Sequence, residues 1–132
     1  MSETNLTFLL RSMKPRLTDG VFVFVTIPQG TPIAGGIAPI MMFQEAEGLS
    51  LIAPREQVEG AGMPYGFSSR MITLDVHSSL EAVGFLAAIA AHLAQAGIAV
   101  NVVSAFHHDH LFVPESRAEE AITALLAMAR SA

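Results

Sequence analysis

The chain has 132 residues, 52% of them hydrophobic and only 14% charged, with a formal net charge of −5 at pH 7. Soluble domains carry about 25% charged residues, so we expect part of the apolar surface to be covered in a homodimer. The seven Lys and Arg residues are scattered, whereas nucleic-acid binding depends on clustered positive charge, so no nucleic acid is expected as a partner. The absence of cysteine excludes disulfides and thiolate sites and fits a cytoplasmic protein.

Two segments bear on targeting and on membranes. The amino-terminal residues contain no basic stretch followed by a long apolar run, so we expect no secretory signal. The most apolar segment, residues 80–96, contains Glu81, His92 and Gln95 and is shorter than the roughly 20 apolar residues that a membrane-spanning helix needs. It is predicted to be a buried helix, and no membrane is expected as a partner.

Apolar runs separated by Gly and Pro define the elements of the first half. They predict a short helix, a buried strand, a hairpin of two strands and a second short helix, at residues 4–13, 21–27, 40–46 with 49–52, and 55–61. Thr4 or Asn5 is expected to cap the first helix, and Pro15 ends it. The Gly- and Pro-rich residues 29–39 cannot form a helix or a central strand.

The second half predicts a βαββ unit and then a final helix. The four elements of the βαββ unit are expected at residues 71–76, 80–96, 98–106 and 111–113. Ser78 with Glu81 forms a capping-box pattern that predicts the start of the long helix at Leu80, and Gly97 is placed to close it in a left-handed conformation. The polar residues 107–110 are expected to form the hairpin turn between the last two strands.

Both helices of the second half carry apolar faces. For the long helix we expect a core stripe of Leu86, Ile89, Ala90 and Leu93 and an opposite face of Phe85, Ala88 and Ala91. A helix that is apolar nearly all round is buried on two sides, against a second sheet or another subunit. The C-terminal helix begins with a second capping-box pattern, Ser116 with Glu119. Its apolar face is expected to consist of Ala118, Ile122, Leu125, Leu126 and Ala129.

Residues 84–98 carry a resemblance to a known family. Gly84 to Ile89 followed by Leu93 to Ile98 resembles the "G-x-L-x-x-I … L-x-x-x-G-I" core of ACT domains, the small modules that sense amino acids in metabolic regulation. The chain as a whole resembles a small bacterial family of stand-alone ACT-like proteins. The further segments that suggest this are residues 19–24, 47–52 and 77–84.

The resemblance implies an α+β fold of the ferredoxin-like βαββαβ type, with a mostly antiparallel sheet and helices on one face. It implies two intimately packed ACT-like halves, a degenerate N-terminal half at residues 1–70 and a C-terminal module at residues 71–132. Within the sequence, residues 47–54 followed by a helix parallel residues 109–114 followed by a helix, because both are a strand, a proline and then a helix. Two related halves are therefore expected.

The start of the long helix is the candidate binding site. The free N–H groups of a first helical turn and the positive end of the helix dipole favour a carboxylate. In ACT domains the ligand lies between the strand-to-helix loop of one module and a neighbouring module. Carried over, the resemblance implies ligand contacts at His77, Ser78, Ser79, Glu81, Val83 and Gly84, with Asn101 facing them from the next strand. The alternative is that Ser78 and Glu81 only cap the helix and that His77 is a surface residue.

A second candidate is a metal site built from His107, His108 and His110. In an extended strand His107 lies on one face and the other two on the opposite face. Three ligands for Zn²⁺ or Ni²⁺ therefore require His77 or His92 as well. A polar hairpin tip, or titratable residues at a subunit interface, explains the same histidines without a metal.

No motif predicts catalysis or a cofactor. The serines lie outside a G-x-S-x-G elbow, and no glycine-rich phosphate loop precedes a helix. We therefore expect no enzyme activity and no cofactor. The expected function is that of a non-catalytic regulatory or sensor protein of the ACT type, which binds an amino acid or another small carboxylate. Two alternatives stay open: a metal-binding protein that uses the histidines at 107–110, and a purely structural dimerisation module.

Overall fold

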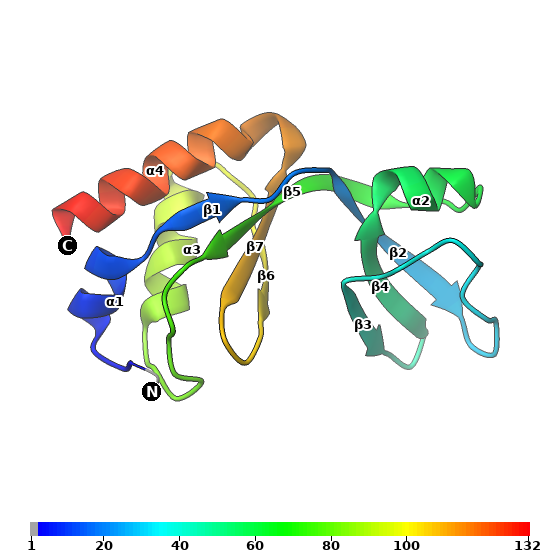
Figure 1. The fold of residues 1–132 in the computed structure, drawn as a ribbon, viewed down its shortest axis with the longest axis horizontal. Helices are drawn as coiled ribbons and strands as arrows, with labels where there is room; N and C mark the ends of the chain where they lie inside the picture. Colours follow the sequence, from blue (N-terminus) through cyan, green and yellow to red (C-terminus); the bar gives the residue numbers. More distant parts are fainter. Residues whose placement is uncertain (1–2) are drawn as a thin grey trace. The chain divides into compact units, whose positions relative to one another are not determined.

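The computed structural model describes residues 3–132, which form two compact units (Figure 1). The terminal unit comprises Met1–Thr18 and Arg70–Ala132, and the central unit comprises Asp19–Ser69. The helices are α1 (Leu6–Ser12), α2 (Arg55–Gly60), α3 (Phe85–Gln95) and α4 (Ala118–Ser131), with a 3₁₀ turn η1 (Glu115–Arg117) before α4. The strands are β1 (Pro15–Leu17), β2 (Phe22–Pro28), β3 (Met41–Gln44), β4 (Gly48–Pro54), β5 (Gly66–Leu74), β6 (Asn101–Ser104) and β7 (Asp109–Pro114).

The terminal unit is an α+β layer structure. The second half of β5 lies between β1 and β7, and β6 pairs with the outer side of β7. The pairs β1 with β5 and β6 with β7 are antiparallel. The order β5, α3, β6, β7, α4 with β1 as the last strand is that of a ferredoxin-like module whose final strand comes from the amino-terminal end of the chain. The predicted βαββ order is therefore confirmed.

One apolar core holds the terminal unit together. Its fully buried side chains come from α1, from the inward faces of β5 and β7, and from one stripe of α3 and of α4: Leu9, Ile72, Leu74, Ile89, Leu93, Leu111, Val113 and Leu125. Burial of a side chain of this size contributes about 1.5–3 kcal/mol. The three helices therefore share one face of the strands, in agreement with the expected ACT-like layering.

The central unit has the strand order β3, β4, β2 and the first half of β5, with antiparallel pairing. Its apolar core includes Val25, Leu51 and Val58, the last from α2. Residues 29–40, which would supply the first helix of a ferredoxin-like module, form turns and irregular chain instead, as their Gly and Pro content predicts. Gly48 turns the β3–β4 hairpin at φ 154°, and a Cβ there would overlap the carbonyl oxygen of Ile27.

The start of α3 differs from the prediction. The helix begins at Phe85 and not at Leu80, with Gly84 as its N-cap at φ 94° and no side-chain cap. The expected capping box of Ser78 and Glu81 is wrong, because Ser78 makes a tertiary hydrogen bond instead. Ser79 Oγ accepts from the backbone N–H of Glu81 at 3.0 Å, which folds this stretch into turns.

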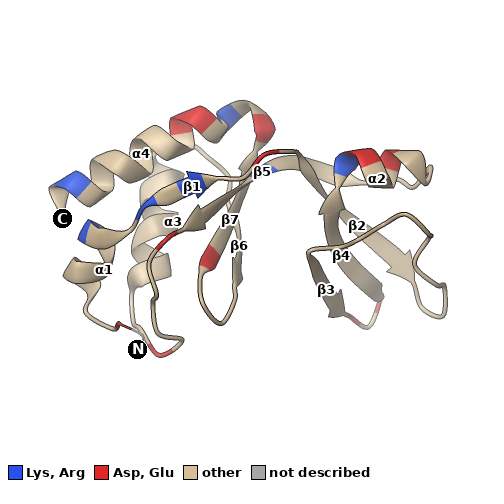
Figure 2. Cartoon of the chain, viewed as in Figure 1, with Lys and Arg blue, Asp and Glu red and all other residues tan. Residues whose placement is uncertain are grey.

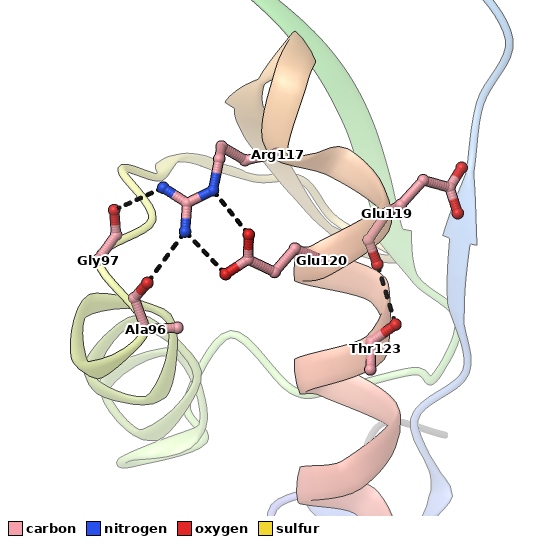
Figure 3. A network of polar contacts seen from close by, with 6 residues as sticks. All are labelled: Ala96, Gly97, Arg117, Glu119, Glu120 and Thr123. Carbon is pink, nitrogen blue, oxygen red and sulfur yellow. Dashed lines mark hydrogen bonds and ion pairs between the residues drawn. The ribbon is translucent and has the colours of Figure 1, made fainter.

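The end of α3 matches the prediction. Gly97 has φ 73°, its N–H donates to the carbonyl of Ala94 and the N–H of Ile98 donates to that of Leu93. These two bonds form a Schellman motif. Arg117 adds a second closure, because its guanidinium donates to the carbonyls of Ala96 and Gly97 at 3.0 and 3.1 Å (Figure 3).

Other expected details are corrected as follows. Phe85 belongs to the buried stripe of α3 and not to the opposite face, because it lies one and two four-residue steps before the buried Ile89 and Leu93. The Ser116–Glu119 capping box does not form, since η1 precedes α4 and Arg117 occupies the N-cap. Leu126 lies outside the core face of α4 and is exposed.

Some strand bounds differ from the prediction, whereas the cap of the first helix agrees with it. Strand β6 is shorter than the predicted 98–106, and β7 starts at Asp109, so that the turn covers residues 105–108 and not the predicted 107–110. Strand β1 was not predicted, because three residues that include a proline give almost no periodic signal. Asn5 caps α1 as one of the two expected residues, since its side chain accepts from the N–H of Phe8. Within residues 3–132, no helix has the length and apolarity needed to cross a membrane.

Candidate functional site

A pocket of about 150 Å³ lies at the N-terminal end of α3, within the terminal unit. The loop between β5 and α3, the first turn of α3, and the β6–β7 hairpin all contribute to it. Its lining consists of Ser78, Ser79, Leu80, Ala82, Gly84, Phe85, Leu86, Ala87, Ser104, Ala105 and Asp109.

Backbone donors form one side of the pocket. The first intrahelical bond of α3 runs from Ala88 N–H to the carbonyl of Gly84, so the N–H groups of Phe85, Leu86 and Ala87 precede the helical ladder. All three residues line the pocket, and no side chain caps the helix. The positive end of the helix dipole adds to these donors. This side of the pocket therefore suits a carboxylate.

A buried carboxylate also lines the pocket. Asp109, the first residue of β7, is only 6% exposed, and Ser78 Oγ donates to its Oδ2 at 3.0 Å. Among the residues that the structure describes, no Lys or Arg forms an ion pair with Asp109. A charge withdrawn from water in this way is costly unless hydrogen bonds or a cation compensate it. This side of the pocket therefore suits an ammonium group.

Basic side chains are absent from the sequence around the site. Residues 71–116 contain no Lys or Arg, and Figure 2 places the basic residues of the terminal unit on α1, on β1, on β5 and around α4. The lining offers a negatively charged ligand group backbone and hydroxyl donors but no Lys, Arg or His side chain. A second negative charge on a ligand would therefore find no basic side chain in the lining itself.

Three of the seven residues expected at the ligand, Ser78, Ser79 and Gly84, line the pocket. The side chains of His77, Glu81 and Val83 are exposed and outside the lining, and Val83 is 86% exposed. Asn101 lies at the other end of β6, opposite Phe112, and also outside the lining. Ligand contact at these seven residues stays a prediction.

Eight lining residues were not among the expected contacts, and three of them lie in the β6–β7 hairpin. Ser104 ends β6, Ala105 follows it, and Asp109 pairs with Ser104 across the hairpin. The one signal for Asp109 in the sequence is an acidic residue within a polar turn, which by itself indicates only solvent exposure. Its burial depends on the register of β6 with β7 and on Ser78.

The histidines lie next to this pocket. Ring centroids are 5.0 Å apart for His77 and His108, 6.0 Å for His77 and His107, and 6.4 Å for His107 and His108. His108 Nε2 is 3.6 Å from Asp75 Oδ1. Within residues 3–132, no group of three or more His, Asp or Glu side chains could hold a metal ion, so the structure does not support the alternative metal site of His107, His108 and His110.

The two remaining histidines have partners elsewhere. His110 Nδ1 lies 2.9 Å from the hydroxyl of Thr73, and burial, together with the charge of His108, lowers the pKa of His110. His92 on α3 has its Nε2 3.1 Å from the carbonyl of Ala124. Neither ring is therefore free to turn toward His77 without losing a hydrogen bond.

A larger pocket of about 410 Å³ lies in the central unit, between the residues before β2 and the start of α2. Asp19, Glu56 and Glu59 line it together with Arg55. Helix α2 has only six residues, and the three carboxylates oppose an anionic ligand group. The smaller pocket in the terminal unit, which combines helix donors with one buried carboxylate, is the better candidate for a zwitterionic ligand.

Comparison with protein families shows where this chain belongs. One ACT domain profile matches residues 1–70 and a second matches residues 66–127. The chain therefore belongs to the ACT domain family, whose members are regulatory modules. No curated protein matches the chain.

Solved structures agree with this assignment. A crystal structure of a Vibrio cholerae protein of unknown function, described as a possible transport protein, is 41% identical, with a TM-score of 0.85 over 94% of this chain and 95% of that one. The regulatory subunit of aspartate kinase from Thermus thermophilus, in its ligand-free form, is 14% identical, with a TM-score of 0.63 over 90% and 97% of the two chains. An Agrobacterium tumefaciens protein has a TM-score of 0.71 at 16% identity, over 89% of each chain. The last two establish similarity of fold, that of ACT regulatory domains with two repeats.

Proposed function

We propose that this protein is a non-catalytic sensor or regulatory protein that binds a neutral α-amino acid in the pocket at the start of α3. The observation that carries the proposal is the presence, in one pocket, of uncapped helix N–H groups and of the buried carboxylate of Asp109. A zwitterionic amino acid has a partner for both features. Its carboxylate accepts from the N–H groups of the first turn of α3, and its ammonium donates to the carboxylate of Asp109.

The composition of the pocket supports a neutral side chain on the ligand. Leu80, Ala82 and Ala105 provide apolar surface, and no basic residue is available to balance an acidic side chain. A simple carboxylate would leave Asp109 without a cation and would place two negative charges in the same pocket. An amino acid is therefore favoured over a carboxylate that lacks an amine.

A regulatory role is supported by the family, because ACT domains are ligand-binding regulatory modules and not catalysts. The regulatory subunit of aspartate kinase from Thermus thermophilus, which has the same fold, has such a role in another protein. We infer that ligand binding here biases contacts with a further protein or with a second copy.

A homodimer fits the exposed apolar residues of the central unit. Strand β3 is the edge of that unit's sheet and carries the exposed side chains of Met42 and Phe43, preceded by Ile40. Large apolar residues on an edge strand are a usual place for pairing with another chain. Light scattering after size exclusion tests this part of the proposal, since a mass of one chain at all concentrations would contradict it.

A thermal-shift screen of the purified protein against the twenty amino acids tests the proposed function. A ligand present at 100 times its dissociation constant stabilises the native state by about 2.7 kcal/mol, which raises the unfolding temperature by several degrees. We expect one or a few neutral amino acids to raise it and Asp and Glu to leave it unchanged. Stabilisation by Asp or Glu alone, or by none of the twenty, would contradict the proposal.

A further inference from the structure

We propose that the pocket at the start of α3 selects a small β-hydroxy amino acid, serine or threonine, and that Ser104 recognises the hydroxyl group of this ligand. The selectivity rests on the proposed function, because it names which of the neutral amino acids the same pocket favours. Three observations carry it: the place of Ser104 beside Asp109, the free hydroxyl of Ser104, and the small volume of the pocket.

Ser104 lies beside Asp109 on one face of the β6–β7 hairpin. The two residues are directly opposite each other in the antiparallel register, and the Cβ atoms of such a pair are about 4.5–5.5 Å apart on the same face. Both residues line the pocket. An ammonium group that donates to Asp109 is therefore held next to Ser104. The β-hydroxyl oxygen of serine or threonine is only three bonds from its own ammonium nitrogen, which brings it within reach of the Ser104 side chain.

The hydroxyl of Ser104 is available for a ligand. Within residues 3–132 it forms no hydrogen bond. The other two serines of the lining are engaged, because Ser78 donates to Asp109 and Ser79 accepts from a backbone N–H. A serine hydroxyl can donate and accept, so Ser104 can pair with a ligand hydroxyl in either direction. An amino acid with an alkyl side chain would make no such bond.

The volume of the pocket favours a short side chain. About 150 Å³ is half of the lower bound of about 300 Å³ for sites that hold drug-sized ligands. It equals the space of about five water molecules at about 30 Å³ each. A long side chain would extend past Leu80, which is 67% exposed, and would bury little surface. Serine and threonine have short side chains, and Ala105 offers apolar surface to the methyl group of threonine.

Calorimetric titration of the full chain with L-serine, L-threonine, L-alanine and L-leucine tests this selectivity. One hydrogen bond between neutral groups changes affinity about 3- to 10-fold, so serine should bind to wild type more tightly than alanine by this factor, and leucine should bind more weakly than serine. In Ser104→Ala the serine and alanine affinities should become equal, through a loss for serine alone. Ser116→Ala, at an exposed serine outside the lining, should keep the wild-type ratio.

L-Homoserine tests the position of the ligand hydroxyl without a change in the protein. Its hydroxyl oxygen is one bond further from the ammonium nitrogen than that of serine, while its charged groups are the same. A hydroxyl recognised beside Asp109 therefore predicts that homoserine binds to wild type about 3- to 10-fold more weakly than serine. Equal binding of the two ligands would contradict the role of Ser104.

Two further results would overturn this selectivity and leave the proposed function standing. One is tighter binding of leucine or alanine than of serine and threonine to wild type. The other is a serine-to-alanine ratio that stays unchanged in Ser104→Ala, with the fold of the variant checked by circular dichroism. Absence of binding by every neutral amino acid would overturn the proposed function together with the selectivity.

Discussion

The hydroxyl of Ser78 donates a hydrogen bond of 3.0 Å to Oδ2 of Asp109, which connects the loop before α3 to the first residue of β7. The two residues are 31 positions apart in the sequence. This contact keeps a buried carboxylate beside the uncapped start of a helix. It also explains why α3 begins at Phe85, since a serine engaged with β7 does not cap a helix at Leu80.

The first prediction concerns Ser78 itself. Ser78→Ala removes a hydrogen bond from the buried carboxylate of Asp109 and is expected to cost about 1–3 kcal/mol of unfolding free energy. Urea unfolding measures the change. Ser131→Ala is the control, because the hydroxyl of Ser131 is exposed at the end of α4 and its loss should cost less than about 0.5 kcal/mol. Equal stability of the two variants would mean that the Ser78–Asp109 bond does not form.

The second prediction concerns the start of α3. Gly84 has φ 94°, and a Cβ there would meet only Leu6 Cδ2 at the ordinary distance of 3.6 Å. Gly84→Ala is therefore expected to destabilise the protein by about 1–2 kcal/mol through backbone strain and not through a clash. Gly60→Ala, at a helical position of α2 with open space, is expected to be neutral or slightly stabilising. A neutral Gly84→Ala would show that the N-cap is not left-handed.

The third prediction compares the effect on stability of replacing Leu93, within α3, and Leu80, where α3 was predicted to start. Leu93 is fully buried in the core, and Leu80 is 67% exposed in the loop before α3. Leu93→Ala is expected to cost about 2–5 kcal/mol because it leaves a cavity, and Leu80→Ala less than about 0.5 kcal/mol. The same urea unfolding experiment measures both. A large loss for Leu80→Ala would place that residue in the core and contradict a helix that starts at Phe85.

The fourth prediction is a pH dependence at the junction of α3 and α4. Arg117 donates to both carboxylate oxygens of Glu120 at 2.8 Å, which lowers the pKa of Glu120 below its ordinary value of 4.5 (Figure 3). A lowered folded-state pKa contributes stability above pH 4.5 that is lost as the pH falls through the folded value. The difference in unfolding temperature between wild type and Glu120→Gln should therefore be present at pH 7 and disappear in acid.

Glu119→Gln is the matched control for this measurement. Glu119 neighbours Glu120 in the first turn of α4, but Thr123 donates to the backbone carbonyl of Glu119 and not to its carboxylate. Its unfolding temperature should follow that of the wild type through the acid range. A pH-independent difference for Glu120→Gln would contradict the ion pair.

Local chemistry made some elements predictable from the sequence. Gly97 closes α3 in the expected left-handed conformation, and Asn5 caps α1, because these signals depend on residues within one turn. The ACT resemblance gave the fold, and the family profiles confirm it.

Features set by distant partners were not predictable in the same way. Strand β1 exists through its pairing of Pro15 and Leu17 with β5, and its three residues have no periodicity to read. Asp109 is buried because of its register with Ser104 and its bond to Ser78, so a polar turn in the sequence concealed a buried carboxylate. The capping-box pattern at Ser78 predicted the wrong helix start for the same reason. Three of the expected site residues nevertheless line the pocket, since the loop before α3 was identified correctly.

The central claim is that the pocket at the start of α3 recognises both charges of an amino acid, and calorimetric titration tests it most directly. Wild type and Asp109→Asn are each titrated with the amino acid that the screen selects. They are also titrated with its analogue without the amine and with its analogue without the carboxylate. Asp75→Asn, at an exposed carboxylate of the loop that carries Ser78, is the control. If both charges are recognised, each analogue should bind to wild type at least 10-fold more weakly than the amino acid does. Asp109→Asn should lower the affinity for the amino acid at least 10-fold, and Asp75→Asn should leave it unchanged. Undiminished binding of the amino acid to a folded Asp109→Asn variant would contradict the account.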